Sequence, residues 1–308
     1  MTDILIIVNP VSAGGSTGRR WPAVQRRLRA RGFEFEVALT TKPLEATEIA
    51  RREVRGSRPL VVAAGGDGTI NEVVNGFFDE DRPQRSDTRL GVLPLGTGGD
   101  FRRTFGIPDD PVRAARFLLV GTPRRIDAGC ARFRTRAGEE QMRHFINIAD
   151  AGVGGEVVER VNRSRKRLGG RATFLAASLV SIARWQNKEM RLRVDGEVRE
   201  LTAQQVVVAN GQYYGSGMRV APGAMPDDGL FDVVVVGDVT LVENLRGLAK
   251  IRSGTHLEGS NPKWEVLRGR HVSVASPEPV RIDLDGEQPG VLPATFELVP
   301  AAITLMCP

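Results

Sequence analysis

The segment Leu60-Val-Val-Ala-Ala-Gly-Gly-Asp-Gly-Thr69 joins a short apolar run to a glycine-rich turn. An apolar run of about four to eight residues that ends in glycine is typical of a buried strand. Glycine admits positive φ angles and close backbone approach, and the amides that open a following helix attract phosphate. An aspartate among these glycines disfavours a bare phosphate unless a cation intervenes. The segment therefore predicts a nucleotide phosphate site that uses a divalent metal, although a tight turn with a capped helix would give the same local pattern.

Two more glycine-rich loops follow apolar runs. Asn9-Pro-Val-Ser-Ala-Gly-Gly15 comes after Ile4–Val8, and Gly96-Thr-Gly-Gly-Asp100 comes after Leu90–Leu95. Each could also be an ordinary turn. Ligands of open α/β sheets bind outside the carboxyl ends of the strands, so we expect all three loops at one edge. No G-x-x-x-x-G-K-[ST] motif occurs, which excludes a Walker-type site.

The first 124 residues alternate strand and helix patterns, which predicts an α/β domain with a doubly wound parallel sheet. The expected strands are Ile4–Val8, Phe33–Leu39, Leu60–Ala64 and Leu90–Leu95. The expected helices are Trp21–Arg31, Leu44–Val54, Ile70–Phe78 and Pro111–Val120.

The period changes near residue 124, and residues 125–293 predict a mainly antiparallel β-sandwich domain. The expected strands are Arg125–Phe133, Met142–Ile148, Met190–Val194, Leu201–Ala209, Leu230–Val236, Val266–Val274 and Val280–Asp285. The expected helices are Glu156–Asn162, Ala172–Gln186 and Leu241–Ile251.

Composition limits the partners and the compartment. The chain has 308 residues and a net charge of +6, which favours acidic partners such as nucleotides or anionic membranes. Aromatic residues make up only 6% and no base-stacking motif is visible, so we expect no nucleic acid. Cys130 and Cys307 form no metal or disulfide pattern, and no signal peptide is apparent, which indicates the cytoplasm. The apolar stretches are too short to span a bilayer, so membrane contact is expected to be peripheral.

Two later segments carry carboxylates in turns. Met225-Pro-Asp-Asp-Gly-Leu230 resembles an oxygen-ligand metal site in which Asp228 gives its side chain and Met225 and Leu230 give carbonyls. An ordinary Asp-Gly turn is the alternative. In Val280-Arg-Ile-Asp-Leu-Asp-Gly-Glu287, a carboxylate after the strand could accept a proton from an attacking hydroxyl, or the segment could be a surface hairpin.

In their order and spacing, these motifs resemble the diacylglycerol kinase catalytic family, which includes sphingosine and ceramide kinases and soluble bacterial lipid kinases. The resemblance covers nearly the whole chain. The matching segments are Asn9–Gly15, Gly65–Glu72, Leu93–Phe101, Arg125–Gly129, Pro226–Asp232 and Asp285–Glu287.

The resemblance implies a kinase that transfers phosphate from ATP to a lipid hydroxyl, with Mg²⁺, in a cleft between two domains. Asp67 and Asp100 would organise the metal and water, while Met225, Asp228 and Leu230 would hold a structural Mg²⁺. Glu287 is the preferred catalytic base and Asp285 the alternative. The residues expected to contact ATP are Asn9, Pro10, Val11, Ser12, Ala13, Thr40, Gly66, Asp67, Gly68, Thr69, Ile70, Asn71, Glu72, Thr97 and Asp100.

The resemblance also suggests that residues 294–308 return to the first domain and that the protein forms a homodimer. One position departs from many relatives, because Gly99 stands where they have asparagine before the aspartate. This change removes an amide donor and is expected to loosen the loop.

Two alternative functions stay open, together with the role of one basic segment. A kinase of a soluble substrate, similar to NAD kinases, shares the Gly-Gly-Asp-Gly loop, and a non-catalytic nucleotide or lipid sensor could use the same fold. Residues 160–171 are rich in arginine and precede apolar positions, so they could dock on anionic lipid or simply form a solvated helix face.

Overall fold

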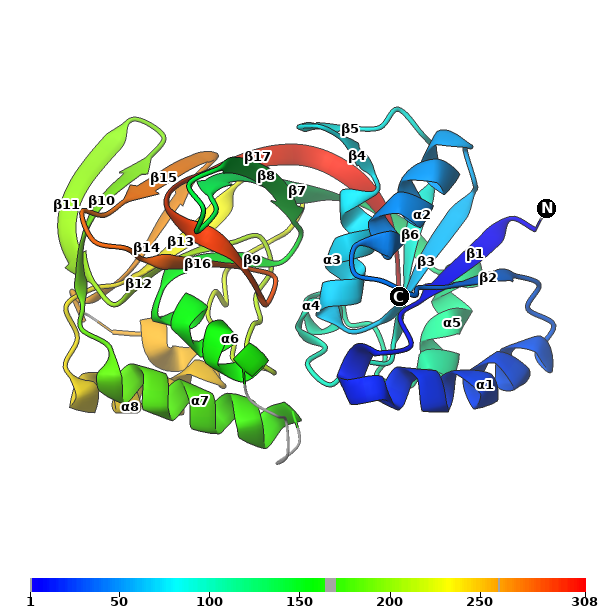
Figure 1. Cartoon of the computed structure of the whole chain (residues 1–308), viewed down its shortest axis with the longest axis horizontal. Helices are drawn as coiled ribbons and strands as arrows, with labels where there is room; N and C mark the ends of the chain where they lie inside the picture. The colour runs from blue at the N-terminus through cyan, green and yellow to red at the C-terminus, as the bar shows by residue number, and fades with distance from the viewer. Residues whose placement is uncertain (1, 164–169, 260) are drawn as a thin grey trace. The chain divides into compact units, whose positions relative to one another are not determined.

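The computed structural model describes residues 2–163, 170–259 and 261–308 (Figure 1). The chain forms two compact units. The first comprises Met1–Asp127 and Pro300–Pro308, and the second comprises Ala128–Val299. The sequence placed these boundaries at residues 124 and 293. Strands β7 (Thr122–Arg134) and β17 (Glu287–Cys307) run through the boundaries and connect the units covalently.

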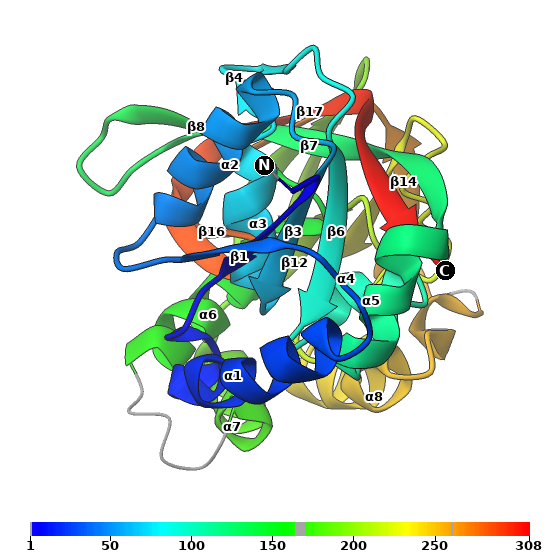
Figure 2. The same cartoon turned by 90° about the vertical axis from the view of Figure 1, so that its right-hand side faces the viewer.

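The first unit contains a parallel sheet in the order β17-β6-β3-β1-β2. Helix α2 packs against α3, and α1 packs against α5 (Figure 2). The predicted α/β class is confirmed, because apolar central strands alternate with helices along this part of the chain. The strands are β1 (Ile4–Val8), β2 (Glu36–Leu39), β3 (Leu60–Gly65), β4 (Phe78–Asp79), β5 (Arg82–Pro83) and β6 (Arg89–Pro94). The helices are η1 (Ser12–Gly15), α1 (Ser16–Arg29), α2 (Glu45–Arg55), α3 (Asp67–Asn75), α4 (Asp100–Thr104) and α5 (Pro111–Val120).

Two helices begin earlier than the sequence pattern predicted. Helix α1 begins at Ser16 and α3 begins at Asp67, in both cases directly after a glycine. The apolar period starts only later in each helix, so periodicity alone placed the starts too late. The earlier start of α3 matters because its first amides then lie at the end of β3.

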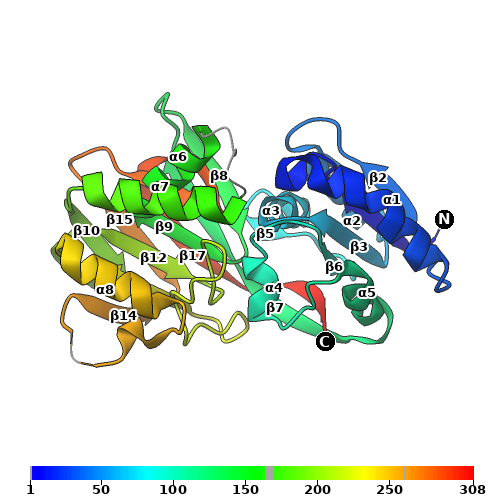
Figure 3. The ribbon, with the colours of Figure 1, turned by 90° about the horizontal axis from the view of Figure 1, so that it is seen from below.

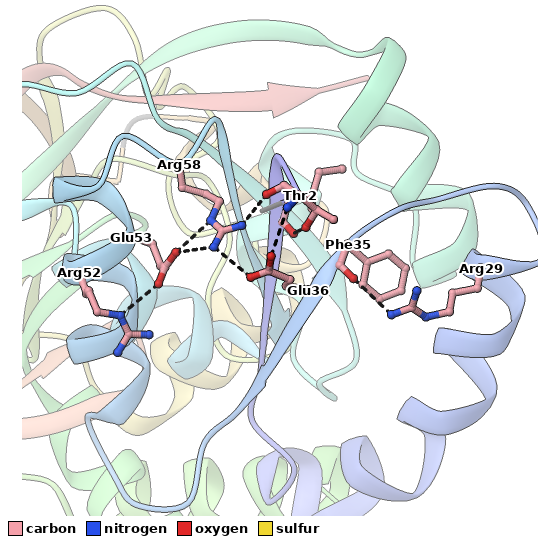
Figure 4. Close-up of polar contacts among 8 residues, drawn as sticks. Thr2, Arg29, Phe35, Glu36, Arg52, Glu53 and Arg58 are labelled. Carbon is pink, nitrogen blue, oxygen red and sulfur yellow. Dashed lines mark hydrogen bonds and ion pairs between the residues drawn. The ribbon is translucent and has the colours of Figure 1, made fainter.

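A buried arginine holds the opposite, amino-terminal edge of the sheet. Arg58 is 6% exposed and forms ion pairs with Glu53 and Glu36, and it also donates to the carbonyl of Thr2 (Figure 4). Burial of a charge is tolerated only when it is paired and hydrogen-bonded. This cluster therefore ties the start of β1 to β2 and α2, away from the glycine-rich loops.

The second unit is a β-sandwich, as predicted. One sheet has the order β14-β13-β12-β9-β16-β17, and strands β11, β10, β15, β7 and β8 form the other with β17. Between them lies an apolar core in which the rings of Phe145 and Phe231 stack, with centroids 5.6 Å apart. The remaining strands are β8 (Glu140–Phe145), β9 (Ile148–Gly152), β10 (Lys188–Val194), β11 (Glu197–Ala203), β12 (Gln205–Ala209), β13 (Phe231–Val236), β14 (Trp264–Gly269), β15 (His271–Ala275) and β16 (Arg281–Leu284).

Three predictions of single strands were wrong, because Met142–Ile148, Leu201–Ala209 and Val266–Val274 each divide into two. At Gln204, for example, the chain passes from β11, which pairs with β10, to β12, which pairs with β9 and β13. The apolar pattern continues through such a crossing, since both sheets face the same core.

Helices α6 (Val153–Arg163), α7 (Gly170–Arg184) and α8 (Leu241–Ile251) belong to the second unit, with a short η2 (Thr255–Leu257) after α8. Helix α6 packs against α7 and also against β9 and β16. In the part of the chain that the structure describes, none of the helices combines the length and apolarity needed to cross a membrane.

The last residues of the chain belong to the first unit. Thr304 and Leu305 of β17 pair in parallel with the start of β6. The carboxylate of Asp127 accepts the Ala301 N–H at 2.6 Å, and Arg125 donates to the Ala301 carbonyl. The Arg-Ile-Asp motif thus holds the C-terminal segment of the chain in the first unit.

Candidate active site

The three glycine-rich loops of the first unit lie against one another. The amides of Leu95 and Gly96 each donate to the Gly65 carbonyl at 2.9 Å, which joins the loops after β3 and β6. The Asn9 amide donates to the Ala64 carbonyl at 3.3 Å. The Thr17 hydroxyl donates to the Leu95 carbonyl and contacts the Ser12 hydroxyl at 2.6 Å. The expectation that the loops share one sheet edge therefore agrees with the geometry.

Close backbone approach explains the glycines in two of these loops. A Cβ atom on Gly96 would lie 2.3 Å from the Gly66 Cα, and one on Gly65 would lie 2.4 Å from Thr69 Oγ1. Real atoms do not approach so closely. The missing side chain of Gly96 thus lets the two loops pack backbone to backbone, and the missing side chain of Gly65 makes room for Thr69 in the same loop.

Asp67 connects the β3–α3 turn to the start of α4. Its Oδ2 atom accepts the amides of Gly99 at 2.8 Å and Asp100 at 3.3 Å, and its Oδ1 atom accepts the amide of Phe101 at 3.1 Å. A carboxylate has about four lone-pair sites, so these amides occupy most of its capacity. Asp67 therefore fixes the conformation of the neighbouring loop directly.

Gly99 adopts a φ angle of +66° as the residue before α4. Asparagine and glycine are the residues that visit this left-handed region most readily. Glycine at this position can therefore adopt the required positive φ angle, as the asparagine of many relatives can. The Gly99 amide is held by Asp67.

Arg103 holds the same loop from the other side, and the sequence patterns did not identify it. Its Nη1 atom donates to the carbonyls of Gly98 at 2.6 Å and Gly99 at 2.8 Å, and it lies 3.0 Å from Asp100 Oδ1. Spacing of three residues on a helix brings Asp100 and Arg103 together, and that spacing was the available signal. Asp100 is 7% exposed and belongs to this loop-holding cluster.

The other residues predicted to contact ATP differ in burial and in hydrogen bonding. Thr69 is buried and its hydroxyl has no hydrogen-bond partner, so it is an orphan polar group beside the glycines. The first amides of α3, at Asp67–Thr69, have no acceptor within the helix. Glycine loops, free helix amides and an orphan hydroxyl fit a phosphate group. Thr40 and Asn71 are buried, whereas Val11 and Thr97 are exposed.

In the second unit, Asp285 accepts three backbone amides. Its Oδ1 atom accepts the amides of Asn147 at 3.0 Å and Ile148 at 2.9 Å, and its Oδ2 atom accepts the amide of Ile146 at 2.9 Å. Asp285 has a φ angle of +50° and is 9% exposed. It therefore fastens the β16–β17 turn to the β8–β9 turn, much as Asp67 fastens its two loops.

Glu287 has a more open environment. Its carboxylate pairs with Arg143 Nη1 at 2.9 Å, and its side chain is 37% exposed. Asp283 accepts the Gly286 amide at 2.8 Å and so shapes the turn between Asp285 and Glu287. Of the two candidate bases, Glu287 is the one whose carboxylate is more accessible.

A buried pair of carboxyl groups lies beside this turn. Asp150 on β9 and Asp283 on β16 are direct cross-strand neighbours. Asp150 is 0% exposed and neither of its carboxyl oxygens has a hydrogen-bond partner. The sequence patterns did not point to Asp150, because neither its burial nor its cross-strand partner can be read from the local sequence.

Burial raises the pKa of Asp150 to about 7. Burial also raises the pKa of Asp283 well above its ordinary value, and the nearby carboxyl groups of Asp150 and Asp285 raise it further. Burial and the charge of Asp150 raise the pKa of Tyr214, whose hydroxyl accepts from Gln205. The two carboxyl groups of this pair therefore favour the protonated form more than an ordinary aspartate does.

One predicted ligand of the structural metal, Asp228, already forms an ion pair. Asp228 pairs with Arg268, which also donates to Asp232 at 2.9 Å, and Asp228 Oδ1 accepts the Leu230 amide at 3.0 Å. Met225 is half exposed. Positively charged or N–H donors therefore occupy both oxygens of Asp228, and this arrangement does not fit a cation unless Arg268 moves. Among the described residues, no group of three or more His, Cys, Asp or Glu side chains has metal-binding geometry.

Half of the basic segment 160–171, residues 164–169, lies outside the described residues. Within the described part, Arg160 on α6 donates to the Ser181 hydroxyl on α7 at 3.1 Å.

Two family models match the chain. The diacylglycerol kinase catalytic domain matches residues 3–131, and the YegS C-terminal NAD kinase beta sandwich-like domain matches residues 147–307. The first match contains the glycine-rich loops, and the second contains the Asp150, Asp285 and Glu287 cluster.

Relatives and solved structures agree with these matches. Diacylglycerol kinases of Bacillus subtilis and Staphylococcus carnosus are 30% and 28% identical over 94% of this chain and 91% and 90% of their own length. Two Bacillus anthracis structures, the second described as a diacylglycerol kinase, have TM-scores of 0.79 and 0.71 at 23% and 22% identity, over 99% of this chain and 96% of theirs. Yeast NADH kinase has a TM-score of 0.52 at 14% identity, over 98% of this chain and 82% of its own. The chain therefore belongs to the diacylglycerol kinase catalytic family, with a C-terminal domain of the YegS type.

Proposed function

We propose that the protein is an ATP-dependent lipid kinase that transfers the γ-phosphate of ATP to a hydroxyl group of diacylglycerol or a related lipid. Family membership supports phosphorylation of a lipid. The observation that carries the nucleotide part is the contact of the three glycine-rich loops with one another, together with the amides of the Gly96–Asp100 loop that Asp67 accepts and the free amides of α3.

The first unit would bind and align the nucleotide. Phosphoryl transfer depends mainly on alignment and on neutralising charge at the transferred group. The first amides of α3 and the Thr69 hydroxyl would donate to phosphate oxygens. Asp67 and Arg103 would keep the Gly96–Asp100 loop in its binding conformation. Mg²⁺, when bound with ATP, would neutralise phosphate charge, and Asp67 and Asp100 would help to hold the metal through water.

The second unit would supply the carboxylate that accepts the proton of the acceptor hydroxyl. An alcohol has a pKa far above neutrality, so a positioned carboxylate assists when the proton leaves. Glu287 is our preferred acceptor for that proton, because its carboxylate is partly exposed and Arg143 fixes its position. Asp285 is the alternative, and its three amide contacts give it a positioning role in the β8–β9 turn.

The structural Mg²⁺ predicted at Met225, Asp228 and Leu230 takes no part in this proposal, since Arg268 occupies the Asp228 carboxylate. The proposed acceptor is a membrane lipid, so we also propose peripheral membrane association on the cytoplasmic side. A homodimer remains a prediction, which light scattering of the purified protein would test.

Labelled ATP offers a direct test. The purified protein would be incubated with γ-labelled ATP and Mg²⁺ in the presence of a total lipid extract, diacylglycerol or NAD. Transfer to diacylglycerol or to another lipid is expected, and the labelled species identifies the substrate. Transfer to NAD alone would favour the soluble-substrate kinase, and ATP binding without transfer to either would favour a sensor.

An inactive variant must accompany this assay to exclude a contaminating kinase. Asp67→Ala is suitable, because Asp67 accepts the Gly99 and Phe101 amides and so holds the loop before α4. Label transfer that persists unchanged in this variant would not come from the proposed site.

A further inference from the structure

Helix α8 has an apolar outer face. Leu241, Val242 and Leu245 are 48%, 56% and 44% exposed, and the next exposed apolar residue, Ala249, follows Leu245 by four positions. Residues at four-residue spacing lie on one side of a helix. Large apolar side chains gathered on one exposed side mark an interaction surface.

The opposite side of α8 already has its packing partners. Asn244, Gly247 and Ile251 are buried, and a Cβ on Gly247 would lie 2.5 Å from the Trp264 ring. A capping box between Thr240 and Glu243 fixes the start of the helix. The outer apolar side chains are therefore not needed to hold α8 in place.

Cations flank the apolar face. Arg246 and Lys250 on α8 and Arg252 after it are exposed, and among the described residues none of the three forms an ion pair with a carboxylate. The acidic residue of the helix, Glu243, pairs with Lys263 at 2.8 Å. The face thus combines exposed apolar side chains with uncompensated positive charge.

The neighbouring helix repeats this composition. Helix α7 lies beside α8 (Figure 3) and contacts it. Leu179 and Val180 of α7 are 41% and 39% exposed, and Arg184 at its end is exposed as well. We name the outer residues Leu179, Val180, Arg184, Leu241, Val242, Leu245, Arg246 and Lys250 the α7–α8 face.

We infer that the α7–α8 face docks the protein on anionic lipid bilayers. Interfacial helices bind membranes through a buried apolar face together with electrostatic attraction to anionic lipids, and each cation near the surface strengthens that attraction. The inference rests on the proposed lipid kinase function, because an enzyme whose acceptor resides in a bilayer has to reach it. Docking would therefore involve the exposed sides of α7 and α8, in contrast to docking through residues 160–171 alone.

Vesicle flotation tests the docking surface. The full-length protein would be mixed with phosphatidylcholine vesicles or with vesicles that also contain phosphatidylglycerol. We expect binding to the anionic vesicles, weakened by added salt. V242Q/L245Q and R246Q/K250Q are each expected to lower the partition coefficient about tenfold or more.

A matched control comes from the first unit. Leu119 and Val120 on α5 are 58% and 67% exposed, so L119Q/V120Q makes the same kind of change elsewhere. It is expected to bind vesicles like the wild type. Unfolding temperatures equal to that of the wild type would show that all three double variants are folded.

Turnover on a short-chain, water-soluble diacylglycerol separates this inference from the proposed function. The α8 variants should keep wild-type turnover on that substrate while losing vesicle binding. Vesicle binding that both α8 variants retain, equal binding of the wild type to neutral and anionic vesicles, or no vesicle binding at all would overturn the docking inference. Absence of any lipid phosphorylation, with α8-dependent vesicle binding intact, would overturn the kinase proposal alone.

Discussion

Asp67 and Gly99 are joined by a hydrogen bond of 2.8 Å from the Gly99 amide to Asp67 Oδ2. The two residues lie 32 positions apart, in the turns that follow β3 and β6. Gly99 has a φ angle of +66°, and the same carboxylate accepts the next two amides of the chain. One side chain therefore fixes a loop that its own sequence, rich in glycine, would leave free to adopt many conformations.

Asp67→Ala should lower kcat/KM by two orders of magnitude or more, about 2.7 kcal/mol of transition-state stabilisation. The variant loses the acceptor for the amides of Gly99, Asp100 and Phe101, so the loop moves and the phosphates lose their alignment. Steady-state kinetics with ATP and diacylglycerol would measure the change. Asp79→Ala is the control, because Asp79 forms only a partly exposed pair with Arg55 in the same unit. Near-native turnover in folded Asp67→Ala protein would end the assignment of Asp67 to the site.

Gly96→Ala should weaken both nucleotide binding and stability. The added Cβ would meet the Gly66 Cα at 2.3 Å, so the loops after β3 and β6 must separate. Overpacking of this kind costs about 1–3 kcal/mol. Thermal unfolding with and without ATP would show a lower midpoint and a smaller shift by ATP. Gly196→Ala is the matched control, since a Cβ added to Gly196 would have no other atom within 4 Å, and an equal effect of both changes would contradict the argument.

Much of the nucleotide-binding unit could be predicted from local sequence. An apolar strand such as β3, a glycine turn and a helix start all leave signatures within about ten residues. Parallel topology then requires that successive loops share one edge. The meeting of the Gly65–Gly66 turn with Gly96 follows from these rules without knowledge of any side-chain position.

Partnerships between distant side chains could not be predicted in this way. Asp150 and Asp283 face each other because β9 and β16 pair in one particular antiparallel register. A shift by one residue would turn each side chain to the other face, and nothing local specifies the register. The pairing of Arg268 with Asp228 and Asp232 likewise depends on how β13 pairs with β14.

Glu287→Gln should reduce kcat strongly and leave stability unchanged. The side chain is 37% exposed and contributes one ion pair with Arg143, so its loss costs little folding energy. Asp285→Asn should instead lower the unfolding temperature, because an amide replaces one of the oxygens that accept from Ile146, Asn147 and Ile148. Single-turnover rates and thermal unfolding would be measured for both variants. Full activity of Glu287→Gln, beside an inactive but stable Asp285→Asn, would make Asp285 the base.

Arg268→Gln should lower stability by about 1.5–3 kcal/mol, since a hydrogen bond to a charged group contributes about this much. Asp232 is 5% exposed, and its pKa is raised by burial, an effect that Arg268 opposes. Removal of the guanidinium also frees Asp228 for the predicted Mg²⁺. Mg²⁺ should therefore raise the unfolding temperature of the variant more than that of the wild type, and EDTA should reverse the difference. Equal responses to Mg²⁺ would count against a metal site at Met225, Asp228 and Leu230.

Asp150→Asn should make stability less dependent on pH. Burial raises the pKa of Asp150 from 3.8 to about 7 in the folded protein. Well below pH 3.8 the group is protonated in both states. Between pH 4 and 7 only the unfolded chain releases the proton, so the free energy of unfolding falls as pH rises. The loss levels off above pH 7 at roughly 4 kcal/mol at most.

Asparagine resembles the protonated carboxyl group and does not titrate. The Asp150→Asn protein should therefore match the wild type near pH 4 and unfold at a higher temperature at pH 8. Asp195→Asn gives a control of opposite sign, because hydrogen bonds from the His271 and Arg270 amides lower the pKa of Asp195. Its stabilising effect is present above the ordinary pKa of aspartate and is lost as pH falls, so Asp195→Asn should cost stability at neutral pH. Parallel stability curves for the wild type and Asp150→Asn from pH 4 to 8 would show that Asp150 is not held in its protonated form.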